Sequence, residues 1–140
     1  MSIRHASKDD CAAIAEIYNH AVVHTAAIWN DKTVDTDNRI AWFEARQIAG
    51  YPVYVHPDHQ GKGLGRSLLV ALIAEAKRLN KHVMVAGIEA QNEASLHLHE
   101  TLGFITTGHM PQVGTKFGRW LDLTFMQLQL DDRRDPDGSA

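Results

Sequence analysis

Gln60-Gly61-Lys62-Gly63-Leu64-Gly65-Arg66-Ser67 is a stretch with three glycines in five residues and two basic side chains, and it sets the type of fold. An apolar pattern typical of a strand precedes it, and a helical pattern that reaches about Leu79 follows it. Glycines at the start of a helix let the backbone come close to a ligand. The free N–H groups of the first helical turn and the helix dipole then favour an anion. With Lys62 and Arg66 beside them, these groups predict a binding site for a pyrophosphate.

Strand and helix patterns on both sides of this loop predict an α/β fold. Tyr51 to Val55 is typical of a strand before the loop, and His82 to Ile88 of a strand after the helix, which makes a βαβ unit. Two helices are predicted upstream, one capped by Ser7 and one by Asp35 or Thr36. Downstream, the patterns predict a helix and two strands, over 92–102, 104–107 and 120–130. The expected architecture is a single domain with a mixed, twisted sheet flanked by helices.

Three interpretations of the glycine loop compete. In the first it is a turn without a ligand, which the entropic cost of three glycines disfavours. In the second it is a phosphate loop of the nucleotide-hydrolase kind, but that motif needs lysine and then serine or threonine after the last glycine, where this chain has Arg66 and Ser67. In the third it is a dinucleotide-binding loop with Glu89 as the ribose-binding acid, although the glycine spacing is one residue short. The dinucleotide fold stays open as an alternative.

The composition is that of an ordinary globular protein. The chain has 140 residues, 44 % of them hydrophobic and 22 % charged, with a formal net charge of −3. This balance gives no reason to expect nucleic acid, no apolar run predicts a membrane span, and the first residues do not resemble a signal peptide. We expect a cytoplasmic protein with one domain over 1–130 and a charged, disordered tail over 131–140. The single cysteine, Cys11, lies on the apolar stripe of the first helix and is expected in the core.

Several motifs, in the right order, resemble those of the GCN5-related N-acetyltransferase (GNAT) family. Gln60 to Gly65 resembles the family's Gln/Arg-x-x-Gly-x-Gly/Ala acyl-CoA loop, and Val53 to Pro57 resembles the central strand and turn before it. Asn92 to Phe104 is similar to the helix that flanks the pantetheine arm. Val113 to Asp122, together with Ile14 to Trp29, resembles the branch that acetylates phosphinothricin, methionine sulfone and methionine sulfoximine on their α-amino group.

The resemblance implies acetyl-CoA as co-substrate and assigns residues to it. In the family, backbone groups of the central strand pair with the pantetheine, a role that falls here to Tyr54, Val55 and His56. Asn92 is expected to hydrogen-bond the pantetheine arm. The acyl-CoA loop is expected to hold the pyrophosphate with Gln60, Gly61, Lys62, Gly63, Leu64, Gly65, Arg66 and Ser67. No metal is expected, because the transfer in this branch needs none.

The chemistry implied by the resemblance needs few protein groups. A neutral amine attacks the thioester directly, so the site must align the two, remove the ammonium proton and stabilise the oxyanion. Many relatives protonate the departing thiolate with a tyrosine where this chain has His99, which makes His99 a candidate acid or, equally, a structural residue. Lys116 and Arg119 are candidates for binding the carboxylate of an amino-acid acceptor, with a solvated basic turn as the alternative.

One part of the family pattern is missing from this chain. The family normally has two antiparallel strands between the second helix and the central strand, and these need on the order of 14 residues or more. Here the second helical pattern reaches about Ile48 and the strand begins by Tyr51, which leaves no room before Val53. Relatives in this branch also carry a glutamate just upstream of the central strand as the proposed base, and 49–52 offer none. Glu89, at the end of the next strand, is the nearest substitute.

The sequence therefore predicts an acetyl-CoA-dependent N-acetyltransferase. Its acceptor is expected to be the α-amine of a small amino acid or analogue of the methionine sulfone, methionine sulfoximine or phosphinothricin type. The alternative is a shortened or degenerate acyl-CoA-binding domain with little catalysis. By analogy with relatives we expect the chain to form a homodimer. Its substrate is expected to be a small-molecule amine, and neither nucleic acid nor a membrane is expected as a partner.

Overall fold

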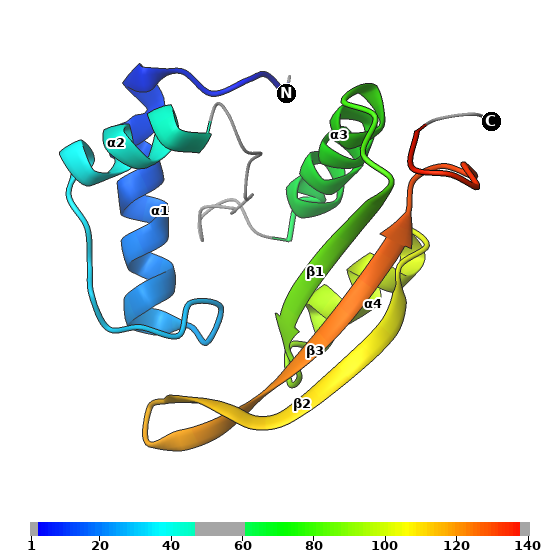
Figure 1. Ribbon diagram of the computed structural model, residues 1–140. Coiled ribbons are helices and arrows are strands. Elements are labelled where there is room, and N and C mark those ends of the chain that lie inside the picture. Colours follow the sequence, from blue (N-terminus) through cyan, green and yellow to red (C-terminus); the bar gives the residue numbers. More distant parts are fainter. Residues whose placement is uncertain (1–2, 47–60, 138–140) are drawn as a thin grey trace. The chain divides into compact units, whose positions relative to one another are not determined.

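The computed structural model describes residues 3–46 and 61–137 of the chain (Figure 1). It divides into two compact units, Met1–Leu69 and Val70–Ala140. The predicted strand over 51–55 lies outside the described residues, and so do the predicted site residues Tyr54, Val55, His56 and Gln60. In the part of the chain that the structure describes, no helix has the length and apolar character to cross a membrane.

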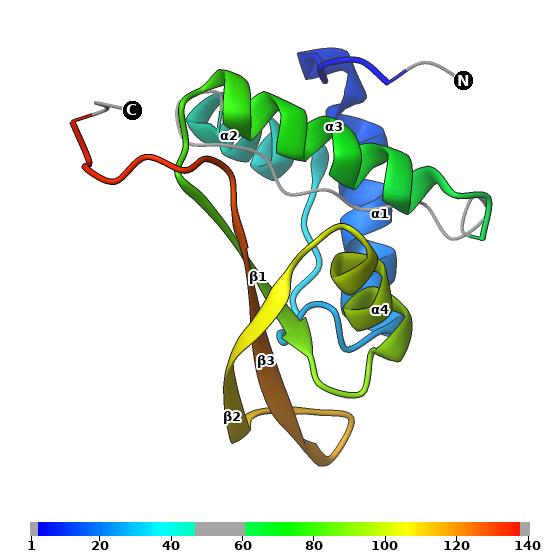
Figure 2. The ribbon, with the colours of Figure 1, turned by 90° about the vertical axis from the view of Figure 1, so that its right-hand side faces the viewer.

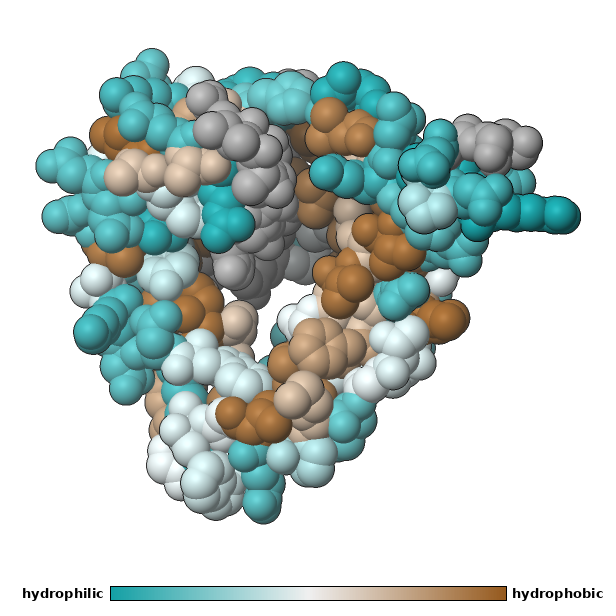
Figure 3. Space-filling model, viewed as in Figure 1, coloured by the Kyte–Doolittle hydropathy of each residue, from teal (hydrophilic) through white to brown (hydrophobic). Residues whose placement is uncertain are grey.

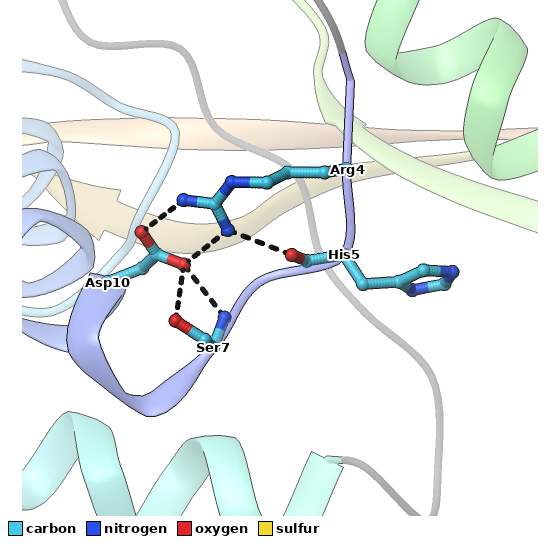
Figure 4. Close-up of polar contacts among 4 residues, drawn as sticks. All are labelled: Arg4, His5, Ser7 and Asp10. Carbon is cyan, nitrogen blue, oxygen red and sulfur yellow. Dashed lines mark hydrogen bonds and ion pairs between the residues drawn. The ribbon is translucent and has the colours of Figure 1, made fainter.

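The first unit begins with three helical elements, η1 (Lys8–Asp10), α1 (Cys11–His24) and α2 (Thr36–Arg46). The predicted cap Ser7 shares a capping interaction with Asp10, whose Oδ2 accepts from the Ser7 N–H at 2.7 Å and from the Ser7 hydroxyl at 3.1 Å (Figure 4). The Arg4 guanidinium binds the same carboxylate with two hydrogen bonds of 2.8 Å. This network holds the chain before η1 against the start of the helices.

Side chains between α1 and α2 form the core of the first unit. Cys11 and Phe43 are buried, and Cys11 Sγ lies 3.7 Å from the carbonyl oxygen of Arg39. Burial raises the pKa of the Cys11 thiol, so the expectation of a core cysteine is confirmed. The Arg39 guanidinium lies over the rings of Tyr18 and Trp42, at 4.4 and 5.0 Å from their centroids. These contacts hold α2 against α1.

Asp10 is expected to stabilise the first unit only while it is ionised. The hydrogen bond from Arg4, followed by that from the Ser7 N–H, holds the pKa of the Asp10 carboxyl well below its usual range. A lowered folded-state pKa adds stability above the ordinary value of about 4, and that stability is lost as the pH falls through the folded-state value. Asp10→Asn should therefore lower the urea midpoint of unfolding at pH 7, and by clearly less at pH 3.

The neighbouring carboxylate supplies the control for this prediction. Within residues 3–46, the side-chain hydrogen bonds of Arg4 go to His5 and Asp10, so Asp9→Asn removes the same charge without breaking them. An equal loss of stability in Asp10→Asn at both pH values would show that the ionisation of Asp10 contributes nothing.

The second unit is an antiparallel sheet with helices on one face. β1 (Val83–Glu89) and β2 (Ile105–Lys116) both pair with the central β3 (Arg119–Gln129), in the order β1-β3-β2. α4 (Glu93–Thr101) and the C-terminal part of α3 (Leu64–Arg78) lie on that face (Figure 2). They supply Leu96 and Ile73, which pack on the core residues Ile88, Phe104 and Met126. The α/β class is confirmed.

β2 and β3 form a long hairpin, and the sequence pattern underestimates β2. The sequence pattern predicts a strand over 104–107, whereas β2 extends to Lys116. The pattern misses the rest of the strand because shifts in its pairing with β3 interrupt the alternation of apolar and polar side chains. The connection is the turn Phe117-Gly118, with φ of +52° and +69°, as a two-residue type I′ turn requires. Lys116 and Arg119 are not part of this turn, because Lys116 is the last residue of β2 and Arg119 is the first residue of β3, and the two pair with each other.

The first residues of the predicted tail contact the start of the sheet. Asp131 Oδ1 lies 2.7 Å from His82 Nδ1, and Arg133 Nη2 donates to the carbonyl oxygen of Asn80 at 2.9 Å. Arg133 also pairs with Asp131, with 2.8 Å between Nε and Oδ2. These contacts tie the chain after β3 to the segment before β1. The domain limit at residue 130 and the disorder of the tail stay predictions.

Candidate active site

The glycine loop leads into α3, as the sequence predicts. Gly61 and Gly63 have φ of +75° and +77°, in the left-handed region that glycine adopts without strain. A Cβ added at either glycine would meet no atom of residues 3–46 or 61–137 within 4 Å, so these residues leave open space beside the loop backbone. The Ser67 N–H and hydroxyl both donate to the Gly63 carbonyl oxygen at 3.1 Å, which closes the first turn of the helix.

The first turn of α3 has the features of an anion site. Ser67 bonds to Gly63, the residue before the helix, so the N–H groups that precede Ser67 have no acceptor within α3. Lys62 and Arg66 are both exposed. Backbone donors, the positive end of the helix dipole and two cationic side chains therefore occur within one short segment, which suits a phosphate group. The pyrophosphate role stays a prediction for Gly61, Lys62, Gly63, Leu64, Gly65, Arg66 and Ser67.

The turn between β1 and α4 holds two of the predicted site residues. Glu89 ends β1 and is buried, with 9 % relative exposure, and its Oε2 accepts from the Gln91 N–H at 3.1 Å. Asn92 caps α4, where its Oδ1 accepts from the Ser95 N–H at 3.1 Å. Within residues 61–137 the Asn92 Nδ2 group has no acceptor. The Asn92 amide therefore keeps its N–H donors, and its role toward the pantetheine arm stays a prediction.

His99 lies on α4 with its ring held in place. Nδ1 is 2.7 Å from the Ser95 carbonyl oxygen, and the ring meets Phe104 edge-on, with centroids 4.9 Å apart. Because a carbonyl oxygen can only accept, Nδ1 carries a proton, and in the neutral ring Nε2 has the lone pair. The ring is half-buried, so the structure is compatible with both the catalytic and the structural role predicted for it.

Lys116 and Arg119 face each other across the end of the β2–β3 hairpin. Lys116 is buried, with 4 % relative exposure, and its Nζ lies 5.1 Å from the centroid of the Phe117 ring. Arg119 is exposed, and its Nη1 donates to Gln91 Oε1 at 2.7 Å. The hydrogen bond connects the hairpin to the turn between β1 and α4.

Three predicted site residues therefore meet at one end of the sheet. Glu89 and Asn92 share a turn, and Arg119 reaches that turn through Gln91. Gln91 had no signal of its own in the sequence, because its partner is on a distant strand. Its position between Glu89 and Asn92 is the clue that could have pointed to it. The glycine loop belongs to the first unit, whereas Glu89, Asn92 and Arg119 belong to the second.

Comparison with known proteins identifies the family. The model of the acetyltransferase (GNAT) family matches residues 5–104, which include the glycine loop, Glu89, Asn92 and His99. The chain belongs to the GNAT acetyltransferase family. This result confirms the resemblance carried by the loop and its flanking motifs, and it excludes the dinucleotide fold.

Curated relatives match over nearly the whole chain. The L-amino acid N-acyltransferase MnaT of Escherichia coli is 64 % identical over 98 % of each chain. The L-methionine sulfoximine/L-methionine sulfone acetyltransferase of Salmonella typhimurium is 61 % identical over 98 % of this chain and 99 % of the relative. A solved structure of a Salmonella typhimurium acetyltransferase with its cofactor acetyl-CoA matches with a TM-score of 0.92 at 58 % identity, over 99 % of this chain and 98 % of that one.

The alignment with the Escherichia coli relative also shows that an internal segment is missing. It runs over 169 positions, at least 29 more than the 140 residues of this chain. Because the alignment covers 98 % of each chain, the extra positions are gaps within this chain and not unmatched residues at its ends. The relative therefore has internal residues without a counterpart here, which confirms the predicted loss of a segment. Its predicted place, before Val53, lies outside the described residues.

Proposed function

We propose that this chain binds acetyl-CoA and transfers the acetyl group to the α-amine of a small amino acid or analogue of the methionine sulfone, methionine sulfoximine or phosphinothricin type. The observation that carries the proposal is the left-handed, open backbone of Gly61 and Gly63 at the start of α3 in a GNAT-family chain. The names of relatives at 64 % and 61 % identity, an L-amino acid N-acyltransferase and a methionine sulfoximine/sulfone acetyltransferase, support the acceptor class.

The proposed roles follow from what each group can donate or accept. Acetyl-CoA supplies an activated thioester, so a neutral amine needs only alignment and the loss of its proton. The backbone N–H groups and cations of residues 61–67 hold the pyrophosphate, and the Asn92 amide donates to the pantetheine arm. Glu89, a buried carboxylate at the end of β1, is the proposed acceptor of the amine proton.

His99 is proposed to protonate the departing thiolate from Nε2. Since Nδ1 is bonded to the Ser95 carbonyl oxygen, Nε2 donates only when the ring carries both protons. A thiol has an ordinary pKa of about 8.5, so the thiolate leaves readily and the proton assists the step without being essential.

His99→Phe is expected to lower turnover about tenfold, with little change in acetyl-CoA affinity. Phenylalanine keeps a ring beside Phe104 but has no Nε2. Turnover is measured by thiol release with methionine sulfone, both in this chain and in a variant that carries the missing segment. Acetyl-CoA affinity is measured by calorimetry. His99→Tyr, which introduces the residue usual in the family, should keep activity. Normal turnover in His99→Phe would assign the proton to water and leave His99 a structural role.

A second candidate function follows from the missing segment, namely a shortened acyl-CoA-binding domain with little catalysis. The observation that favours it is the alignment with the Escherichia coli relative, which extends at least 29 positions beyond the 140 residues of this chain. Calorimetry with acetyl-CoA tests the binding that both candidates share, with NAD as the control ligand. Thiol release with methionine sulfone separates the two, because only the transferase releases thiol faster when the amino acid is present.

We also infer a cytoplasmic homodimer. Its support is a set of exposed apolar side chains on the sheet unit, a kind of surface that marks contacts between chains (Figure 3). Their relative exposures run from 43 % to 65 %, and they are Val85, Ile105, Met110, Val113, Phe117 and Trp120. The single buried cysteine, Cys11, suits a reducing compartment. Sedimentation velocity measures the mass of the assembly directly.

A further inference from the structure

Gln91 joins two of the proposed site residues in the second unit. Its Oε1 accepts from Arg119 Nη1 at 2.7 Å, and its backbone N–H donates to Glu89 Oε2 at 3.1 Å. The turn that carries it is anchored on β3, because the Ala90 N–H donates to the Asp122 carbonyl oxygen at 3.0 Å. Arg119 is an exposed side chain next to a hairpin turn, and Gln91 gives it a defined place near Glu89.

We propose that Gln91 is a positioning residue that aims the Arg119 guanidinium at the carboxylate of the acceptor amino acid. This inference rests on the proposed amino-acid acetylation. An amide oxygen orients a guanidinium without neutralising its charge, whereas a carboxylate at the same place would occupy the fork that an α-carboxylate binds. Within residues 61–137, Arg119 makes no ion pair, so its charge is not neutralised by a neighbouring carboxylate there.

The two hydrogen bonds of Gln91 also keep opposite charges apart. Arg119 binds its side chain and Glu89 binds its backbone, so the guanidinium and the carboxylate are held by the same residue at different atoms. An amino acid at neutral pH carries a cationic amine and a carboxylate on one α-carbon. Arg119 offers a partner for the carboxylate, and the buried Glu89 offers one for the amine. The acceptor class is therefore an α-amino acid with a free carboxylate, in preference to its amide or to a simple amine.

Binding of L-methionine sulfone and of its carboxamide tests the proposal, because the two differ only at the carboxylate. The measurement is an NMR titration of the full chain with CoA present, so no turnover is needed. We expect the wild-type chain to bind the amino acid about tenfold more tightly than the amide. Gln91→Ala should reduce this preference to roughly twofold, since Arg119 stays but is no longer oriented. Arg119→Ala should remove it, and adding Gln91→Ala to Arg119→Ala should change nothing further.

Gln91→Glu distinguishes positioning of the Arg119 guanidinium from a hydrogen bond that only stabilises the structure. A glutamate fastens Arg119 at least as firmly, so a structural role predicts an unchanged preference for the amino acid. The proposal predicts the opposite, because the new carboxylate cancels the Arg119 charge and lowers the preference to that of Arg119→Ala. A preference that stays at the wild-type level in Gln91→Glu or Gln91→Ala would overturn the proposal, and so would a wild-type chain that binds neither acceptor or both equally. Acetyl transfer is measured separately by thiol release, so a failure of the proposed acetyltransferase activity is distinguished from a failure of the positioning role of Gln91.

Discussion

Gly63→Asp is expected to abolish acetyl-CoA binding, with a loss of affinity on the order of 100-fold or more. The new carboxylate would lie at the first turn of α3, where the pyrophosphate is proposed to bind, and like charges brought together repel strongly. The fold should survive, because a Cβ at Gly63 meets no atom of the described residues within 4 Å and aspartate tolerates a φ near +77° better than most residues. Calorimetric titration measures the affinity, and circular dichroism checks the fold.

Gly63→Asn is the matched control for this charge effect. Asparagine has nearly the same shape as aspartate and the same tolerance of positive φ, but no charge. We expect it to weaken acetyl-CoA binding only several-fold, through the loss of close backbone approach. Unchanged affinity in Gly63→Asp would remove the pyrophosphate from this loop. An equal loss in both variants would assign the effect to backbone approach and not to charge.

The helices could be predicted from the sequence because their signals are local. Ser7 caps the first helical segment as expected, and the Asp35 carboxylate accepts from the Asn38 N–H at 2.8 Å, which decides between Asp35 and Thr36 as the cap of α2. Gly103, with φ of +95°, follows the end of α4, where glycine is common because it adopts the left-handed region without strain. Each of these signals involves groups only a few residues apart, so the local sequence is enough to place these helix ends.

Strand β2 could not be predicted in full because its irregular part depends on its partner. Between Met110 and Gly114 the pairing with β3 shifts, and the Asp122 carboxylate accepts from the Gln112 N–H at 2.8 Å. Gln112 has φ of +54°, a conformation that a sequence pattern assigns to a loop. The stabilising group is ten residues away on the neighbouring strand. The hydrogen bond between Arg119 and Gln91 could not be predicted for the same reason, since the length of this hairpin fixes where Arg119 lies.

Restoring the missing segment before Val53 is expected to raise amino-acid acetylation by on the order of 100-fold or more. The chain as written should bind acetyl-CoA, because the glycine loop and Asn92 are present. It should acetylate methionine sulfone weakly or not at all, because the family pattern places two strands of the acceptor side, and the glutamate proposed as base, in the segment that this chain lacks.

The segment to insert consists of the internal residues of the Escherichia coli relative that have no counterpart in this chain. A Gly/Ser linker of equal length is the control, since it restores the spacing but no strands. Thiol release with methionine sulfone measures transfer. Acetyl-CoA affinity, measured by calorimetry, should be similar with either insert, so that a difference in thiol release reports on the acceptor side alone.

Glu89 is expected to account for the activity that the chain keeps without the segment. In the chain as written Glu89→Gln should remove the residual transfer, because a general base contributes on the order of 100-fold or more and glutamine cannot take a proton. The glutamine oxygen can still accept from the Gln91 N–H, which preserves the turn between β1 and α4. In the restored chain the same change should matter little, since the inserted glutamate takes over the proton. Robust turnover by the chain as written, with Glu89→Gln equally active, would show that neither the segment nor Glu89 is needed and that another group removes the amine proton.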